Sequence, residues 1–269
     1  MNFDGYYVKV VDDKRAFAVI FGRNRARGKR SSFVQVITRE RTYNAVYNYG
    51  EYRARKKPFS VQVANNRADG CGMVVDIADG EASFVADLSF DAITPIRGDA
   101  MGFFRFFPFM ECKHKIISMG PAPVYIEGDS GCSFPRKYFW TQCNLFDGFD
   151  DLSVVAMCAV IPYLGFRFLG TICIIHFNGR EYRLATYRGA RVVEFTSDKL
   201  VIKQGRKILE IEISDADKNS HELFAPARGR MERMIKETVF TTARYKFTIN
   251  DRVVFDTTSP YAAFEFSEK

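Results

Sequence analysis

Short runs of β-branched and aromatic residues recur along almost the whole chain, separated by charged or Gly/Asn/Asp turns. Runs such as 17–21, 33–37 and 59–63 have the composition of strands, because Val, Ile, Phe and Tyr pack well on a pleated surface. Polar and apolar residues alternate in 199–203 and 209–213, which is typical of a half-exposed pair of strands. This pattern strongly constrains the fold toward β-sheet.

Helical periodicity of any length is missing from the sequence. The two short candidates, 109–115 and 229–238, also fit strands. Asn178-Gly179 and Asn250-Asp251 stand where tight hairpin turns belong. Many short strands spaced about 8–12 residues apart favour antiparallel barrels or sandwiches. The sequence therefore predicts an all-β chain.

A Gly- and Pro-rich stretch at 120–136 separates two runs of predicted strands. A length of 269 residues suits one large or two small domains. We therefore expect an N-terminal domain at 1–135 and a C-terminal domain at 136–269.

The six cysteines form no C-x-x-C pair, and the first residues lack a basic region followed by an apolar one. Reduced thiols and a cytoplasmic location are therefore expected. The most membrane-like stretch, 153–177, is interrupted by Pro162, Gly165, Arg167 and Gly170. These interruptions favour two strands joined by a turn at 162–165 over a membrane-spanning helix.

Basic residues cluster in two loops of a chain whose net charge is +7. The clusters are Arg23, Arg25, Arg27, Lys29 and Arg30, and Arg53, Arg55, Lys56 and Lys57. Solvated hairpin loops explain them most simply, and peripheral contact with an anionic membrane is the alternative. Zinc-finger spacing, a helix-turn-helix pattern and an aromatic ribonucleoprotein motif are all missing, so no nucleic-acid partner is expected.

Motifs for nucleotide or metal cofactors are also missing. The sequence has no G-x-G-x-x-G, P-loop, H-E-x-x-H or EF-hand pattern. Cys112-x-His114 offers only two ligands, which do not make a zinc site. The run 128–131 superficially matches a serine-protease nucleophile loop, but only His114 lies upstream of it. We expect no metal and no cofactor.

Ionisable residues gather in the Phe-rich segment 101–144. Glu111, His114, Glu127 and Asp129 lie there with Trp140, the only tryptophan. Ionisable groups among apolar neighbours have displaced pKa values, which is common at functional sites and also in structural networks. The segment is therefore either a candidate site or a buried network that joins the two halves.

The chain resembles the tocopherol cyclase family, which is related to the lipocalin-like hydroxyneurosporene hydratase group. The resemblance is carried by the segments 3–9, 32–37, 109–119, 125–127, 134–144, 184–190 and 223–231. It implies two lipocalin-like antiparallel β-barrels packed side by side. It also implies cofactor-free, acid-catalysed closure of a chromanol ring on a prenylated hydroquinone or a related isoprenoid.

The resemblance implies roles for ten residues. Asp129 or Glu127 would be the acid that protonates the alkene, and His114 or Glu111 the base or orienting group for the phenol. The expected substrate-binding residues are Trp140, Tyr125, Gln142, Asn144, Tyr187 and Phe109. The expected partner is an apolar prenylated small molecule.

Two other functions remain open from the sequence. The first is a non-catalytic lipid- or isoprenoid-binding protein of the same fold, because one fold can host either function. Tyr6 and Ser130, which stand where the family has Trp, favour this reading, whereas Glu127, Asp129 and His114 favour the enzyme. The second is an anionic-surface or nucleic-acid binder that uses the basic loops.

Overall fold

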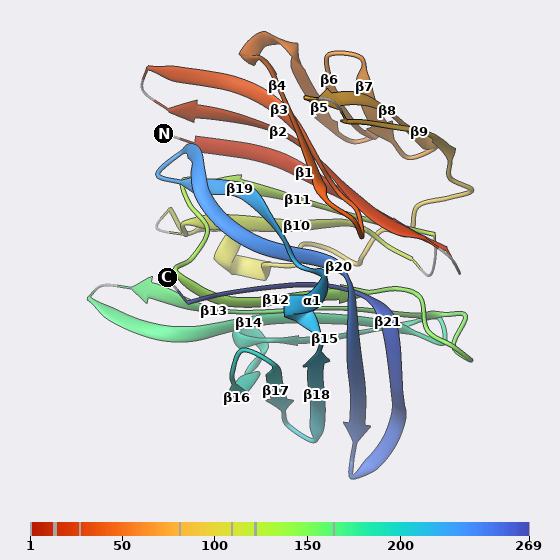
Figure 1. The fold of residues 1–269 in the computed structure, drawn as a ribbon. Helices are drawn as coiled ribbons and strands as arrows, with labels where there is room; N and C mark the ends of the chain where they lie inside the picture. Colours follow the sequence, from red (N-terminus) through yellow and green to blue (C-terminus); the bar gives the residue numbers. More distant parts are fainter. Residues whose placement is uncertain are drawn as a thin grey trace.

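Antiparallel strands make up most of the chain in the computed structural model, which confirms the all-β prediction. The structure describes residues 2–12, 15–26, 28–80, 82–108, 110–120, 123–163 and 165–268. Arg27 of the first basic cluster and Phe109 lie outside these ranges. The strands form three sheets that stack as layers in Figure 1.

The first sheet has six strands, in the order β10-β11-β1-β2-β3-β4. Their bounds are β1 (Asn2–Val11), β2 (Ala16–Ala26), β3 (Lys29–Ile37), β4 (Thr42–Asn48), β10 (Cys112–Met119) and β11 (Val124–Gly131). Pairing of β1 with β11 joins segments more than 100 residues apart, with Gly5 opposite Asp129. This long-range pairing brings the ionisable segment to the N-terminal strand.

The second sheet has five strands in chain order and covers the outer face of the first (Figure 1). Its strands are β5 (Tyr52–Lys56), β6 (Phe59–Val63), β7 (Asn66–Asp69), β8 (Gly72–Asp79) and β9 (Ala82–Ser89). Tyr6, Val8, Phe21 and Val34 of the first sheet pack there against Val75 and its neighbours. This core fills the space between the two sheets.

The third sheet holds the remaining strands, with the path β15-β14-β13-β12-β21-β20-β18-β17-β16 and with β19 paired to β20. The bounds are β12 (Lys137–Cys143), β13 (Leu152–Tyr163), β14 (Phe166–Phe177), β15 (Arg180–Ala185), β16 (Arg191–Phe195), β17 (Lys199–Gln204), β18 (Lys207–Ser214), β19 (His221–Ala227), β20 (Arg230–Ile249) and β21 (Arg252–Glu268). The helical pieces are η1 (Tyr49–Glu51), η2 (Gly102–Phe106), η3 (Thr186–Arg188) and α1 (Ala216–Asn219).

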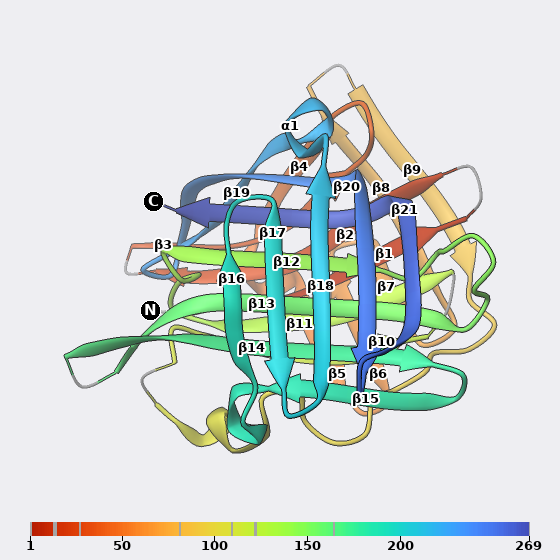
Figure 2. The ribbon, with the colours of Figure 1, turned by 90° about the horizontal axis from the view of Figure 1, so that it is seen from below.

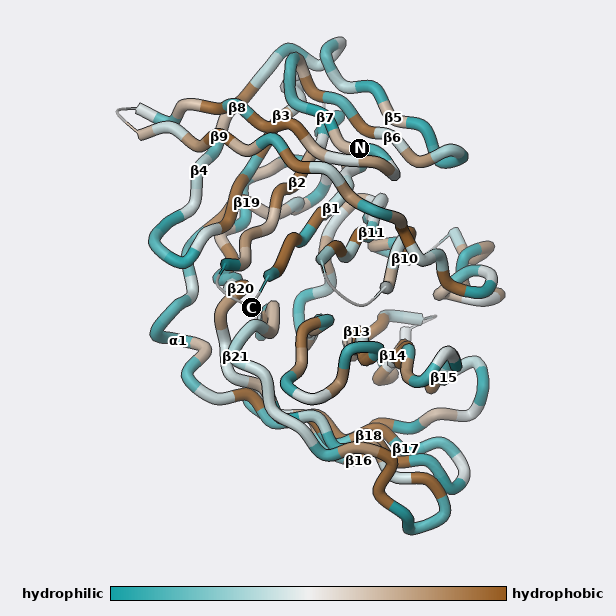
Figure 3. Tube along the Cα trace, turned by 90° about the vertical axis from the view of Figure 1, so that its right-hand side faces the viewer, coloured by the Kyte–Doolittle hydropathy of each residue, from teal (hydrophilic) through white to brown (hydrophobic). Residues whose placement is uncertain are grey.

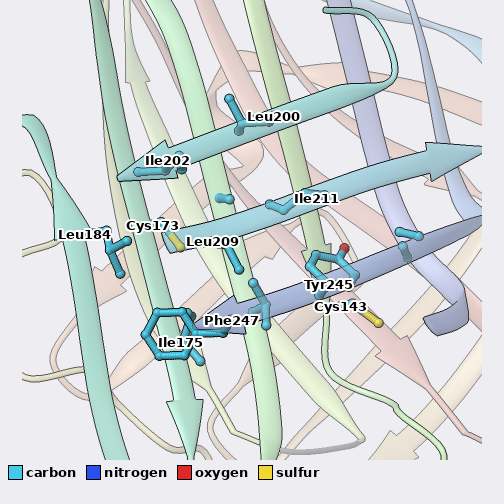
Figure 4. Packing of buried hydrophobic residues seen from close by; sticks show 14 of the residues in the cluster. Cys143, Cys173, Ile175, Leu184, Leu200, Ile202, Leu209, Ile211, Tyr245 and Phe247 are labelled. Carbon is cyan, nitrogen blue, oxygen red and sulfur yellow. The ribbon is translucent and has the colours of Figure 1, made fainter. Parts of the chain in front are cut away.

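The third sheet folds back on itself, so that β16, β17 and β18 cross over β12, β13 and β14 (Figure 2). Figure 4 shows Leu200, Ile202, Leu209 and Ile211 packing toward Cys173 and its neighbours in the resulting core. The predicted pair at 199–203 and 209–213 is confirmed as β17 and β18. Hydrophobic residues line the interior strands in Figure 3, and hydrophilic residues mark the turns.

Several local predictions can be checked directly. Residues 153–177 form the antiparallel strands β13 and β14, and no helix in the described ranges is both long and apolar enough to cross a bilayer. All six cysteines are free. Asn178-Gly179 and Asn250-Asp251 have positive φ and join consecutive strands, as predicted.

Strand β20 differs from the sequence expectation. In the sequence, the apolar runs 239–240 and 245–249 have the composition of two separate short strands, but both are parts of one 20-residue strand that begins at Arg230. Register shifts near Thr238, Thr241 and Phe247 interrupt its pairing with β21. Such bulges bend a strand without ending it, so local composition suggested separate strands.

Gly131, the last residue of β11, allows a close backbone contact beside the ionisable segment. A Cβ added there would lie 2.0 Å from the Glu111 carbonyl oxygen, which accepts hydrogen bonds from the amides of Cys132 and Ser133. We expect Gly131→Ala to destabilise the protein by about 1–3 kcal/mol because the backbone must shift. Urea unfolding measures this, with Gly50→Ala as the control because no atom lies within 4 Å of that position. Equal stability of the two variants would contradict the prediction.

Candidate functional site

A cavity of about 200 Å³ lies between the six-stranded sheet and the ten-stranded sheet. Its lining is predominantly apolar and includes Phe3, Ile20, Phe33, Met157 and Ile172. Acidic and histidine side chains also line it: Asp4, His114, Glu127 and Asp129 on the first sheet, and Glu237 and Glu265 on the third. An apolar pocket with a few convergent polar groups is the usual form of a small-molecule site.

His114, Glu127 and Asp129 form a compact cluster on the wall made by β10 and β11. His114 Nδ1 lies 2.9 Å from Asp129 Oδ1, and His114 Nε2 lies 3.3 Å from Glu127 Oε2. The Cys112 thiol donates to Asp129 Oδ1 at 3.4 Å. His114 and Glu127 are buried, so the structure brings three of the four predicted catalytic residues together on one wall.

Strand alternation explains why these side chains share one wall. Glu127 and Asp129 are two residues apart on β11, so both point to the same face of the sheet. His114 is the register partner of Asp129, and Asp129 faces Gly5, which in turn faces Gly22. Gly22 leaves room for the Phe33 ring, which would lie 2.3 Å from a Cβ at this position. Phe33 lines the same cavity as the charged cluster.

The pKa values of His114 and Glu127 are both displaced from their ordinary values. Burial by itself lowers the pKa of His114, but the Glu127 and Asp129 carboxylates outweigh burial and raise it to about 9. Burial raises the pKa of Glu127 to about 7, although His114 and a hydrogen bond from Tyr125 oppose this. The Tyr125 hydroxyl donates to Glu127 Oε2 at 2.5 Å. At neutral pH the cluster therefore holds an imidazolium beside a carboxyl that exchanges its proton readily.

The opposite wall carries two carboxyls that sequence reasoning missed. Glu237 of β20 and Glu265 of β21 are register partners, and both are buried. Tyr138 donates a hydrogen bond to Glu265. Burial raises the pKa of Glu237 to about 8, and burial followed by the Asp129 and Glu127 charges raises the pKa of Glu265 well above its usual value.

One sequence feature could have revealed Glu265. It is the single carboxylate in the apolar run 261–266 of the last strand, and a lone charge in a buried strand is unusual. Glu237 gives no such indication, because its neighbour Lys236 makes the segment look like an exposed face. Only the pairing of β20 with β21 shows that the two carboxyls are adjacent.

Several buried polar atoms of the residues that line the cavity have no hydrogen-bond partner. They are Tyr7 Oη, Trp140 Nε1 and Glu237 Oε1, together with His114 Nε2, which lies 3.3 Å from Glu127 Oε2 without a hydrogen bond. Unpaired buried polar groups are costly in a folded protein. Donors and acceptors therefore remain available on both walls to a polar group of a bound molecule.

Other predicted site residues lie away from this cavity lining. Tyr125 lies behind Glu127, to which it donates. Gln142 accepts a hydrogen bond from the buried Lys9 ammonium at 3.0 Å and donates to Asn144 at 3.1 Å. Tyr187 donates to the Ala100 carbonyl oxygen at 2.8 Å.

Glu111 contributes its backbone to the turn after β11, and Phe109 lies outside the described residues. Trp140 does line the cavity and packs edge-on against Tyr7. Of the six predicted substrate-binding residues, the structure therefore places Trp140 where it can touch a ligand in the cavity.

A divalent metal could in principle use the same cluster. One ligand atom from each of His114, Glu127 and Asp129 lies within 4.8 Å of the others. A histidine must be neutral to bind a metal, whereas these two carboxylates raise the pKa of His114 to about 9. Metal binding at this cluster at neutral pH would therefore have to displace the His114 proton.

Residues 97–267 match the family model described as tocopherol cyclase-like. A curated relative, named "Probable tocopherol cyclase, chloroplastic" from Oryza sativa subsp. japonica, is 24% identical over 205 residues. The alignment covers 64% of this chain and 43% of the rice protein, so the chain spans less than half of the length of this relative.

Two solved structures share the fold at low sequence identity. A Nitrosomonas europaea protein assigned as AttH superimposes with a TM-score of 0.55 at 9% identity, covering 100% of this chain and 93% of that one. Kievitone hydratase from Nectria haematococca superimposes with a TM-score of 0.50 at 11% identity, covering 99% and 88%. At such low sequence identity, these two similarities show a shared fold and no shared activity.

Proposed function

Because the chain belongs to the tocopherol cyclase-like family, we propose that it catalyses a cofactor-free, acid-initiated addition of an oxygen nucleophile to an alkene. The proposed reaction is the cyclisation of a prenylated hydroquinone or a related isoprenoid. One observation carries the proposal: the His114–Glu127–Asp129 cluster lines an apolar cavity between two sheets. Protonation of an alkene needs a carboxyl that stays protonated near neutral pH.

Glu127 is the acid in this proposal. Of the two candidates, Asp129 is already engaged, since its Oδ1 lies 2.9 Å from His114 Nδ1. Burial keeps a fraction of Glu127 protonated at neutral pH. The Glu127 carboxyl would transfer its proton to the less substituted alkene carbon and leave a tertiary cation, to which the phenol oxygen then bonds.

The remaining residues would position the substrate. His114, fixed by Asp129, would donate to a substrate oxygen through Nε2, which makes no hydrogen bond in the protein and lies 3.3 Å from Glu127 Oε2. The aromatic faces of Trp140 and Tyr7 lie in the cavity lining and would stabilise the cation by about 0.5–2 kcal/mol per face. Phe3, Phe33 and Phe134 would contact the prenyl tail.

The alternative is a protein that binds an isoprenoid without transforming it. A binding protein needs the apolar lining, but the buried carboxyls and the histidine in the lining add only desolvation cost to such a role. The ionisable groups therefore favour the enzyme. Tyr6, which stands at a position where the family has Trp, packs against Phe59 on the other face of the first sheet, so its identity does not shape the cavity.

The function can be tested by incubating the purified protein with a prenylated hydroquinone and no added cofactor. We expect a chromanol product of the same mass, separable by chromatography. The matched control is Ala159→Phe, because Ala159 lines the cavity opposite the charged cluster and a benzyl group would occupy the space of the ligand. We expect the control to bind an apolar fluorescent probe at least about 30-fold more weakly, a loss of about 2 kcal/mol.

Two outcomes separate the hypotheses. Probe binding by the wild-type protein without conversion of any prenylated hydroquinone would support the binding protein. Equal probe affinity of wild type and Ala159→Phe would place the ligand elsewhere and contradict both readings.

The proposal includes a peripheral contact with anionic lipid, where such a substrate partitions. Arg23 and Arg25 of β2 and Arg53 and Arg55 of β5 carry the basic charge. Arg23 is partly engaged, since it pairs with Asp4 at 3.3 Å and lies over Tyr52. Arg53 and Arg55 are exposed and would supply the attraction to an anionic surface.

The proposal also keeps two lipocalin-like barrels with a boundary at 135/136. The six- and five-stranded sheets use strands up to Gly131, and the ten-stranded sheet begins at Lys137. Each set has a core of its own, and the cavity lies between the two sets. In this proposal the active site is made by both domains.

A further inference from the structure

Large apolar side chains are exposed on η2 and at the outer end of the β13–β14 hairpin. These residues, which we call the aromatic patch, are between 43% and 78% exposed: Phe103, Phe106, Tyr163 and Phe166. The Phe104 ring of η2 stacks on the Phe168 ring of β14 with centroids 6.4 Å apart, which brings the two segments together. Exposed apolar patches mark surfaces that contact a membrane or another protein.

The aromatic patch continues the lining of the cavity outward. Four register pairs of the β13–β14 hairpin project from one face, because positions two apart on a strand point to the same side. From the inside outward they are Met157–Ile172, Ala159–Gly170, Ile161–Phe168 and Tyr163–Phe166. The first three pairs line the cavity, whereas the last pair is exposed. The apolar floor of the cavity therefore leads to the solvent at this end of the hairpin.

The η2 segment borders the same end of the cavity. Met101 and Phe104 are among the cavity-lining residues, and Phe103 stacks on Phe104 with centroids 4.7 Å apart. Figures 1 and 2 show the β13–β14 hairpin extending beyond the strands beside it. A flat surface that met this projecting end would contact the aromatic patch and the outer end of the cavity together.

The charge beside the aromatic patch is positive. Arg105 and Arg167 are exposed, and the segments 101–110 and 161–170 contain no Asp or Glu. The Arg105 guanidinium lies 4.4 Å from the Phe106 ring centroid and 3.5 Å from Asp99. Aromatic rings flanked by arginines suit an anionic lipid surface, because the rings enter the interface and the guanidinium groups meet the phosphates.

The position of the aromatic patch favours a bilayer over a protein as the occupant. A protein seated on it would cover the outer end of the cavity. A bilayer in the same place would deliver an apolar molecule directly to the lining, because such a molecule partitions out of water into lipid.

We infer that the aromatic patch docks on an anionic lipid bilayer and that the apolar substrate passes from the bilayer into the cavity past Phe104 and Phe168. The identity of the substrate rests on the proposed function, whereas the docking does not depend on it. The inference assigns the main membrane contact to η2 and the β13–β14 hairpin, with Arg53 and Arg55 of β5 in an auxiliary role.

The first arm of the test measures cosedimentation of the protein with vesicles of phosphatidylcholine and phosphatidylglycerol. We expect Phe106→Ser with Phe166→Ser to weaken binding at least about tenfold, because both rings leave water in the docked state. The matched control is Val85→Ser with Val253→Ser, at side chains that are 69% and 55% exposed on β9 and β21. The control should bind as the wild type does. Equal binding by all three proteins, or no binding by the wild type, would overturn the inference.

The second arm identifies the part of the protein that enters the lipid. In Phe166→Trp, we expect brominated phospholipid to quench the fluorescence of the introduced indole, because aromatic side chains sit at the membrane interface. Val85→Trp is the control and should lose no fluorescence. The native Trp140 is buried and gives the same background in both variants. Equal quenching in the two variants, or none in either, would overturn the inference.

Two further outcomes would assign the contact differently. Vesicle binding that is lost in Arg53→Glu with Arg55→Glu but kept in the double serine variant of the aromatic patch would move the contact to the basic loops. A wild type that dimerises in solution while that serine variant is monomeric would show that a second copy covers the aromatic patch. Either result would overturn the inference. Neither arm uses a substrate, so absence of turnover in the wild type would overturn the proposed function alone.

Discussion

Replacement of Glu127 by Gln together with Asp129 by Asn is expected to abolish turnover of a prenylated hydroquinone. The double variant removes the transferable proton and the carboxylate that lies 2.9 Å from His114 Nδ1. General acid catalysis contributes about 10²–10⁴-fold to a rate, so the residual kcat should be at least about 10³-fold lower than that of the wild type. Product formation followed by chromatography measures this.

The control for this prediction is Glu40→Gln with Asp87→Asn, which makes the same chemical changes at exposed positions and should leave kcat unchanged. The two single variants show how much each residue contributes to the loss of kcat. Glu127→Gln should account for most of the loss, and Asp129→Asn should alter the pH dependence because His114 loses the partner that fixes its imidazolium. Undiminished turnover in the double variant would place the acid elsewhere.

The free energy of unfolding is expected to decrease by about 3 kcal/mol or more between about pH 6 and pH 9. His114 supplies this amount: its pKa rises from 6.5 to about 9 on folding, and each unit corresponds to about 1.4 kcal/mol. Its stabilisation is fully present below its unfolded pKa and is lost as the pH rises through 9. Urea unfolding at a series of pH values measures the decrease.

The buried carboxyls act in the same direction. The pKa values of Glu127 and Glu237 rise from 4.5 to about 7 and about 8, so the folded state holds protons that the unfolded chain releases above pH 4.5. Lys9 acts in the opposite direction above pH 8, because burial lowers its pKa to about 8. His114→Gln should remove much of the decrease, whereas His221→Gln should not. A flat or rising profile for the wild type would contradict the cluster as described.

The sequence determined the local structure of this protein. Alternation and β-branched composition predicted strands, because side chains on a strand project to opposite faces with a period of two. Interruptions at Pro162 and Gly165 predicted the hairpin of β13 and β14. The spacing of Glu127 and Asp129 placed both carboxyls on one face of a strand, and His114 on the neighbouring strand joins them.

Only the tertiary structure decided what faces this cluster. The pairings of β1 with β11 and of β20 with β21, and the stacking of the six-stranded sheet on the ten-stranded one, depend on contacts between segments far apart in the chain. Strand propensity is local and does not specify a partner. For this reason Gln142 and Asn144 lie with the buried Lys9 and not in the cavity lining. For the same reason Glu237 and Glu265, 28 residues apart in sequence, come together on one wall of the site.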